Sequence, residues 1–421
     1  MLRSYEIDKG VRLHIDHTDK FKTNFISLHI HDLLGDNTSK LALLPSVLKD
    51  GSQDFPTYMD ISKKLEEMYG MNLSYYLYKK GDRQVMQIFM DPINNKYVDS
   101  DVLGESFKFL SSIIKRPLLD NGFFKRDYVE LEKNNLKKFI ESKINDKEKY
   151  AVDRLIEEMF KGERFANYEY GSIEELKEIN EKNLYEYYEF ALSSLPMDIF
   201  VVGDVKDDEV LKLVKKFFNF KRETLKSVET ANLKKMVSDV RYVVDNLNVV
   251  QGKLILGFRT NVNPKDEDYY KIILLNNILG GGPHSKLFQN VREKESLAYS
   301  IYSRVERFKG FIYISAGIDV NNYEKALNLI LGQVEKIRKG EISKEEYNAS
   351  VNILSNYIRS LSDSPIQRTD YNLSEIIAGT RKDFVEFEKS IRNTTMDDMV
   401  RLSQNIELDT VYFLRNNEEG R

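Results

Sequence analysis

The chain repeats one pattern of residues at a separation of 224 positions. Residues 73–78 read LSYYLY and residues 297–302 read LAYSIY. Each run alternates between two faces, which predicts a strand, with Leu297, Tyr299 and Ile301 on one side of the second. Each run also follows a segment with apolar residues at helical spacing, residues 61–68 and residues 285–294. A duplication at this long period predicts two halves that are built alike.

The remaining elements support the duplication. Further strands are predicted at 11–15, 24–31, 84–90, 197–202, 254–258, 310–318 and 410–414, and long helices open at Lys125 and Lys344. Each half then has strands together with long amphipathic helices, so we expect an α+β fold, with a mixed sheet and helices on one of its faces. The halves are residues 1–222 and 241–421, and the polar, weakly patterned residues 223–240 form the linker.

Composition narrows the class of protein. The chain has 421 residues, 41% of them hydrophobic and 31% charged, which is typical of a globular protein with two or more domains. The net charge of −4 gives no indication of binding to nucleic acid or to an anionic membrane. Cysteine is absent, which excludes disulfides, Cys-ligated metals and a Cys nucleophile. With no apolar signal segment at its start and no membrane-length apolar run, the chain is expected to be cytoplasmic.

The segment 280–305 holds the strongest candidate for chemistry. It opens with Gly280, Gly281 and Gly282, continues as a helical segment to residue 294, and ends in the alternating run. Arg292 lies near the end of the predicted helix, and Tyr299 lies near the start of the predicted strand. The rigid fork of the guanidinium and the phenol can converge on a peptide carbonyl or carboxylate.

This segment resembles the C-terminal half of the insulinase, pitrilysin and mitochondrial processing peptidase family of zinc metallopeptidases. In that family a Gly-rich turn precedes S-[RK]-L-[FY] and R-E-x-x-x-L-[AG]-Y, and the Arg and Tyr of the pattern bind substrate. The resemblance places these roles on Arg292 and Tyr299. It extends weakly over residues 1–240 and implies two similar halves that face each other like a clamshell.

The three glycines have two interpretations. Their backbone freedom allows a loop that closes over an extended peptide substrate. They also fit an ordinary turn that ends a helix. If the first holds, replacing Gly281 and Gly282 by Ala should weaken peptide binding and leave stability nearly unchanged.

The metal half of the family's site is missing from the sequence. In the family, H-x-x-E-H on a helix of the first half binds zinc and polarises water. The helix at this place is residues 39–51, which contains neither His nor Glu. Leu41, Leu44 and Leu48 give it an apolar face, and Pro45 is expected to weaken or kink it unless it starts late. No zinc, other metal or cofactor is therefore expected in this chain.

Other residues could in principle hold a metal. The five histidines are His14, His17, His29, His31 and His284. His29 and His31 share a strand face, as an H-x-H metal pair would, but a half-buried structural pair with no acidic neighbour is the favoured interpretation. Glu130, Glu132 and Glu141 lie near where the family's last zinc ligand would be, and a solvated helix face explains them more simply. No phosphate-binding loop or G-x-S-x-G motif is present.

Three functions are compatible with these patterns. The favoured one is a non-catalytic, substrate-binding subunit that pairs with a zinc-bearing homologue to hydrolyse peptides. The alternatives are a purely structural subunit and a homodimeric peptide-binding protein. The duplication favours a special role for the second half: at the offset of 224, Tyr299 matches Tyr75, whereas Arg292 matches the apolar Met68.

Overall fold

We analysed a computed structural model of the chain, which describes residues 2–228 and 235–416. The chain forms two compact units. The first contains Met1–Ser142 and Asn167–Thr230, and the second contains Lys143–Ala166 and Ala231–Arg421. The predicted clamshell arrangement of the two halves stays a prediction.

The first unit is built on a six-stranded sheet with the order β1-β2-β8-β3-β5-β4. Only β2 and β8 pair in parallel; the other neighbours are antiparallel. The strands are β1 (Leu2–Asp8), β2 (Val11–His17), β3 (Phe25–Leu33), β4 (Leu73–Lys80), β5 (Arg83–Met90) and β8 (Met197–Gly203). Its main helices are α1 (Thr38–Asp50), α2 (Tyr58–Glu67), α3 (Val102–Lys115), α4 (Arg126–Ser142), α6 (Ile173–Glu178), α7 (Glu181–Ser194) and α8 (Asp207–Phe217).

One face of this sheet forms the core with the helices. The side chains of alternate strand residues, such as Leu28 and Ile199, are buried there together with Leu41, Leu44 and Leu48 of α1. Full burial of one such side chain stabilises the fold by about 1.5–3 kcal/mol. Helix α1 runs through Pro45 without interruption, so the expected weakening does not end the helix. Its apolar surroundings hold it in place.

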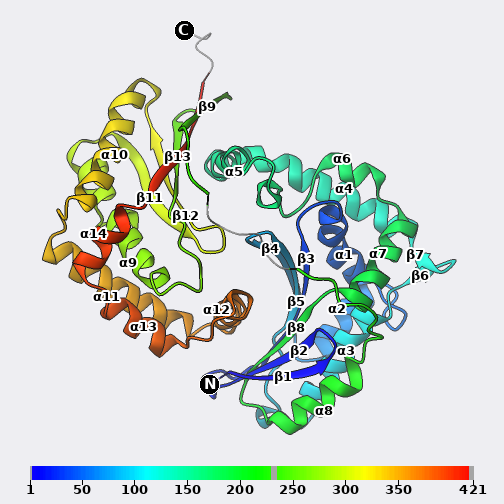
Figure 1. The fold of residues 1–421 in the computed structure, drawn as a ribbon. Coiled ribbons are helices and arrows are strands. Elements are labelled where there is room, and N and C mark those ends of the chain that lie inside the picture. The colour runs from blue at the N-terminus through cyan, green and yellow to red at the C-terminus, as the bar shows by residue number, and fades with distance from the viewer. Residues whose placement is uncertain (1, 229–234, 417–421) are drawn as a thin grey trace. The chain divides into compact units, whose positions relative to one another are not determined.

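The second unit has a five-stranded sheet with the order β11-β12-β10-β13-β9, in which only β13 and β9 are parallel. Helices α9, α10, α11, α13 and α14 lie on one face of it (Figure 1). The strands are β9 (Arg241–Asn246), β10 (Gly252–Arg259), β11 (Ala298–Glu306), β12 (Phe311–Ile318) and β13 (Glu407–Arg415). The helices are α9 (Tyr269–Gly280), α10 (Tyr323–Arg338), α11 (Lys344–Leu361), α12 (Pro365–Ala378), α13 (Phe384–Arg392) and α14 (Met396–Ser403).

The two sheets match strand by strand. The order β2-β8-β3-β5-β4 in the first unit corresponds to β9-β13-β10-β12-β11 in the second, with the parallel pair at the same place. The predicted α+β fold with two similar halves is therefore confirmed. The sequence analysis did not predict two edge strands, β1 and β9.

Helix α5 (Lys147–Met159) packs in the second unit although the sequence analysis assigned it to the first half. It covers the face of the sheet opposite to α9 and α10, against β10 and β13 (Figure 1). The contact is close because Gly257 of β10 has no side chain: a Cβ there would lie 2.7 Å from the Sδ of Met159. Arg259 adds a hydrogen bond to the carbonyl of Met159. Helices therefore cover both faces of the second sheet, so the prediction of helices on one face only is wrong for this unit.

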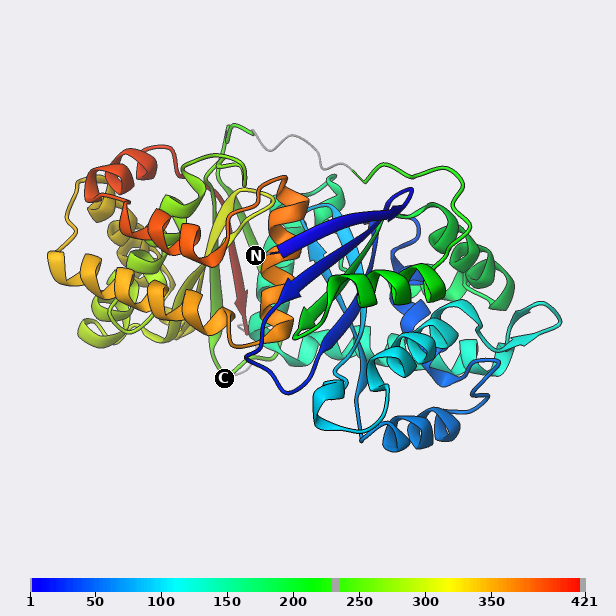
Figure 2. The same cartoon turned by 90° about the horizontal axis from the view of Figure 1, so that it is seen from below.

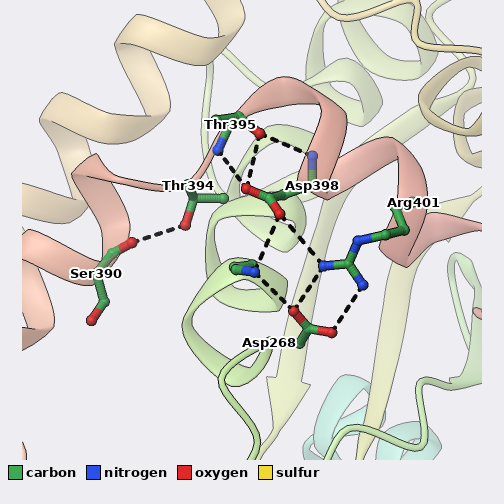
Figure 3. Close-up of polar contacts among 7 residues, drawn as sticks. Asp268, Ser390, Thr394, Thr395, Asp398 and Arg401 are labelled. Carbon is green, nitrogen blue, oxygen red and sulfur yellow. Dashed lines mark hydrogen bonds and ion pairs between the residues drawn. The ribbon is translucent and has the colours of Figure 1, made fainter.

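A network of charges ties α14 to α9 within the second unit (Figure 3). The carboxylate of Asp398 accepts hydrogen bonds from the backbone N–H and the hydroxyl of Thr395, which caps the start of α14. Lys271 of α9 and Arg401 of α14 both bind Asp268 and Asp398. The hydrogen bond from the Thr395 backbone is the main reason that the pKa of Asp398 falls to about 2.

The polar linker behaves as predicted where it is described. Residues 223–228 and 235–240 form no helix or strand, and residues 229–234 lie outside the described residues. Across 2–228 and 235–416, no helix combines the length and the apolar character needed to cross a bilayer.

Candidate functional site

Arg292 lies in a π-helical segment, Phe288–Lys294, and its side chain is 43% exposed. The guanidinium stacks over the ring of Phe288 at 4.7 Å, and its Nε lies 3.7 Å from a carboxylate oxygen of Glu293. These contacts hold the guanidinium in place, and no hydrogen bond engages it in the described residues. The sequence predicted an ordinary helix here, whereas π-helical turns are rare and are frequent at functional sites.

Tyr299 is the extra residue of a β-bulge. In the pairing of β11 with β12, Ala298 lies opposite Ile318 and Ser300 lies opposite Gly317, so Tyr299 has no partner of its own. Its side chain is 60% exposed, whereas Leu297 and Ile301 are buried. The prediction that these three residues share one face is wrong, because the bulge interrupts the alternation and turns the phenol outward.

The turn between Arg292 and Tyr299 is closed by backbone hydrogen bonds. The N–H of Leu297 bonds to the carbonyl of Val291, and Ser296 has a φ of 52°. This is the left-handed turn that commonly ends helices, here with Ser where Gly is usual. It places the end of the π-helical segment directly beside the start of β11.

The first unit closes the equivalent turn in the same way, and this changes which of its residues corresponds to Arg292. There the N–H of Met71 bonds to the carbonyl of Leu65, and Gly70 takes the left-handed position with a φ of 67°. Matching these two closures equates Arg292 with the exposed Glu66. The predicted match with Met68 is wrong, because the repeat shifts by two residues between helix and strand.

Arg292 and Tyr299 therefore form one exposed corner of donors. No side-chain hydrogen bond joins either of them to another residue in the described part of the chain. A guanidinium and a phenol that make no hydrogen bond within the described residues can both donate to a carbonyl, a carboxylate or an oxyanion. Such a corner can bind and orient a substrate.

The three glycines next to this corner differ from one another. Gly280 ends α9, and a Cβ there would lie 2.6 Å from the backbone nitrogen of Ser303; a Cβ at Gly281 would lie 2.6 Å from the Cα of Asn277. These two permit close packing, so the expectation that Gly281 can be replaced without loss of stability is not supported. Gly282 has a φ of 157°, and a Cβ there would meet only the ring of His284, at an ordinary contact distance of 3.6 Å. Of the three, it alone suits a mobile loop.

A cavity of about 520 Å³ lies on the other side of the glycine turn. His284 hydrogen-bonds through Nε2 to Asn277 and Ser350, and burial lowers its pKa. Lys286 is held by both carboxylate oxygens of Glu346, at 3.0 and 2.9 Å. His284 and Lys286 are thus engaged in the structure of the unit, and His284 acts as a neutral packing residue.

The place of the family's zinc motif is filled by core residues. Leu41, Leu44 and Leu48 of α1 are at most 1% exposed, and this helix offers no His or Glu. In the described ranges, no group of three or more His, Cys, Asp or Glu side chains is arranged to hold a metal ion. The residues present do not fit zinc, and no catalytic step can be assigned to a metal on this chain.

Two carboxylates near the end of α1 were not predicted as a pair. Asp50 lies close enough to Glu132 of α4 for their charges to interact, and the Oδ2 of Asp50 is buried without a hydrogen-bond partner in the described residues. Burial, and next the charge of Glu132, raise the pKa of Asp50 to about 7. Glu130 and Glu141 are exposed, as a solvated helix face predicts.

His29 and His31 do share a face of β3, but the expectation of no acidic neighbour is wrong. Asp198 of β8 is buried beside them and lies 2.9 Å from Nε2 of His31 and 2.7 Å from Nε2 of His14. Arg12 adds two hydrogen bonds to the same carboxylate. Although burial opposes it, the hydrogen bonds from His14 and His31 hold the pKa of Asp198 well below its usual range. Burial lowers the pKa of His29 and His31, so this is a structural cluster. His17 is exposed, 3.3 Å from Asp204.

Comparison with known proteins decides the family. A family model described as the peptidase M16 inactive domain matches residues 178–354. A protein of Bacillus subtilis (strain 168) described as the probable inactive metalloprotease YmfF is 34% identical over 412 residues, 97% of this chain and 96% of that protein. The chain belongs to the M16 peptidase family. The predicted membership among the insulinase-like peptidases is confirmed, and so is its status as an inactive member.

Solved structures agree with this assignment. A conserved protein from Enterococcus faecalis V583 has a TM-score of 0.93 at 31% identity, with all of both chains covered. An M16 inactive domain from Pseudomonas fluorescens has a TM-score of 0.81, covering 100% of this chain and 99% of the other. Its identity of 16% supports the fold alone.

Proposed function

We propose that this M16 chain is the substrate-binding, non-catalytic subunit of a two-subunit peptidase, whose other subunit is a zinc-bearing homologue. The observation that carries the proposal is the exposed corner formed by Arg292 and Tyr299. Neither side chain makes a hydrogen bond in the described residues, and both are presented by departures from regular structure. A purely structural subunit needs neither.

In this proposal the corner binds a backbone carbonyl or the carboxylate of an extended peptide. Arg292 supplies the charged fork and Tyr299 a single directional donor. Gly282 gives the adjoining loop room to adapt to the peptide, whereas Gly280 and Gly281 hold its base. The zinc and the attacking water belong to the partner, because α1 of this chain has no groups to hold them.

The test begins with purification of the native complex and metal analysis of each subunit. The pair is then reconstituted, and peptide cleavage is measured with Arg292→Ala and with Tyr299→Phe. Loss of one such donor to the reacting carbonyl is expected to lower the rate by roughly 10²–10³. Arg381→Ala and Tyr58→Phe are matched controls, because these side chains are exposed and lie outside the corner.

Each outcome has a distinct meaning. Reduced cleavage with intact pairing and unchanged melting temperature supports the substrate-binding role. Unchanged cleavage in both variants rejects it and leaves a structural role. Loss of complex formation assigns the corner to the subunit interface. Peptide binding by the chain alone as a homodimer, with no zinc subunit recovered, favours the third function.

A further inference from the structure

The second unit lacks counterparts of two elements that cover one end of the first sheet. In the first unit, β1 pairs along β2, and α8 packs beside them (Figure 2). The phenol of Tyr5 on β1 donates to Asp207 at the start of α8, at 2.6 Å, and ties the two together. The strand that corresponds to β2 is β9, and among residues 235–416 no strand pairs with its outer edge.

Residues at equivalent positions of β2 and β9 differ in how far they are exposed to solvent. Leu13 and Ile15 of β2 lie beside Ile199 and Val201 of β8, and they are 0% and 1% exposed. The corresponding pair is Tyr242 and Val244, which lie beside Val411 and Phe413 of β13 and are 61% and 49% exposed.

The apolar surface continues from β9 onto α10. Tyr323 and Leu327 lie one helical turn apart and are only partly buried, packed against the core. The ring of Tyr323 stacks on Phe413, the neighbour of Val244. An apolar edge strand with free backbone donors and acceptors is a surface to which another strand adds readily.

We propose that β9 pairs antiparallel with β9 of a second copy of this chain, across a two-fold axis at Val243. This register sets Tyr242 of one copy opposite Val244 of the other, twice, and Arg241 opposite Asp245, twice. Aromatic pairs with β-branched residues and pairs of opposite charge both stabilise neighbouring strands. In a register centred one residue away, Tyr242 or Val244 lies opposite its own copy, and Arg241 no longer lies opposite Asp245.

The charges at this edge are available for such pairing. Arg241 is exposed and has no ion pair within the described residues. Asp245 accepts hydrogen bonds from Arg154 and from Tyr412, both through Oδ2, which holds the carboxylate in place. Its Oδ1 takes no hydrogen bond in the part of the chain that the structure describes. Each edge thus presents one free cation and one positioned anion, and the two-fold axis brings them together.

This surface is separate from the substrate-binding corner. Strand β9 and strand β11, which carries Tyr299, are the two opposite edges of the same sheet. Pairing through β9 joins two five-stranded sheets and leaves Arg292 and Tyr299 uncovered. The dimer and the proposed peptide binding can therefore fail independently.

A cross-link at the axis tests the register. The chain has no cysteine, so Val243→Cys adds a single thiol, and directly opposed strand residues have Cα atoms 4.5–5.5 Å apart, within disulfide range. We expect the full-length variant to form a covalent dimer under mild oxidation, at least about tenfold faster than Val385→Cys, an exposed control on α13. Equal rates for the two variants at a concentration where the chain is dimeric would overturn the register.

Sedimentation measures the dimer itself. The wild-type chain should dimerise, and Arg241→Glu should weaken dimerisation about tenfold or more, because two attractive pairs become repulsive. Arg241→Lys should restore it, and Arg381→Glu should leave it unchanged. Melting curves exclude misfolding of the variants. The proposal is contradicted if the wild-type chain stays monomeric. It is also contradicted if only a different protein, and not a second copy of this chain, binds to the β9 edge.

Discussion

Replacing Asp50 by Asn should stabilise the protein at pH 8 and have little effect at pH 5. In the folded first unit, burial and the neighbouring charge of Glu132 raise the pKa of Asp50 from 3.8 to about 7, and Lys49 only partly opposes them. Its Oδ2 accepts no hydrogen bond from the described residues. The charge of ionised Asp50 is thus poorly compensated. The amide side chain of Asn has the same shape and carries no charge.

The magnitude follows from proton linkage. Between pH 4 and pH 7 the folded state keeps a proton that the unfolded state has lost, so stability falls as pH rises through this window and levels off above it. A shift of about three units gives a ceiling of about 4 kcal/mol. Because the carboxyl is only about half buried, solvent screening reduces this to the order of 1–2 kcal/mol. For a unit of this size that corresponds to a gain of about 2–6 °C in melting temperature.

The assay is thermal unfolding of wild type and Asp50→Asn at pH 5 and at pH 8. Asp120→Asn is the control, because Asp120 is exposed in the first unit and no ion pair engages it in the described ranges. We expect the gain in melting temperature of Asp50→Asn over wild type to be larger at pH 8 than at pH 5. Asp120→Asn should show no such dependence on pH. The same difference at both pH values, or none at pH 8, would refute the electrostatic explanation.

Three further substitutions test local features of the second unit by thermal unfolding. Asp398→Asn should cost about 1 kcal/mol at pH 7 through the weakened cap of α14, and because the pKa of Asp398 is about 2, this cost should disappear as pH falls from 4 to 2; a cost independent of pH would contradict it. Gly281→Ala should lower stability by about 1–3 kcal/mol, because its Cβ meets Asn277, and an unchanged melting temperature would show that the turn adapts. Ser296→Gly should raise stability by about 0.5–1 kcal/mol by relieving its positive φ; a loss would mean that the Ser side chain contributes more than the strain costs.

The parts of the fold that could be predicted depend on short-range patterns. Apolar alternation in β3 or β10 and helical spacing in α1 come directly from residues that face one core. The edge strands Leu2–Asp8 and Arg241–Asn246 were missed because each pairs with another strand on one side only. Their sequences also mix charged with apolar residues. Helix α5 was assigned to the wrong half because its buried residues Leu155 and Met159 would suit either core. The close contact with Gly257 and the hydrogen bond from Arg259 to Met159 show which sheet they cover.

The candidate site was predicted in its residues and not in its geometry. Arg292 and Tyr299 are recognised by their residue types and spacing, but one added residue in a strand leaves no mark on composition, so the bulge at Tyr299 could not be foreseen. The pair of Asp50 with Glu132 and the cluster around Asp198 join residues that are distant in sequence, and only the packing of α4 on α1 and of β8 beside β3 brings them together.

The two units serve as an internal comparison for the role of the Arg–Tyr corner. In the first unit, polar side chains of the sheet such as His14 and Asp198 are buried and hydrogen-bonded to each other, so they specify the fold. In the second unit, Arg292 and Tyr299 are exposed, and their donors make no hydrogen bond in the described residues. The corner is closed by Ser296 in a left-handed conformation, although the first unit closes the equivalent turn with Gly70. Donors that make no hydrogen bond within their own unit, held beside a strained turn, are what the proposed binding of a peptide requires.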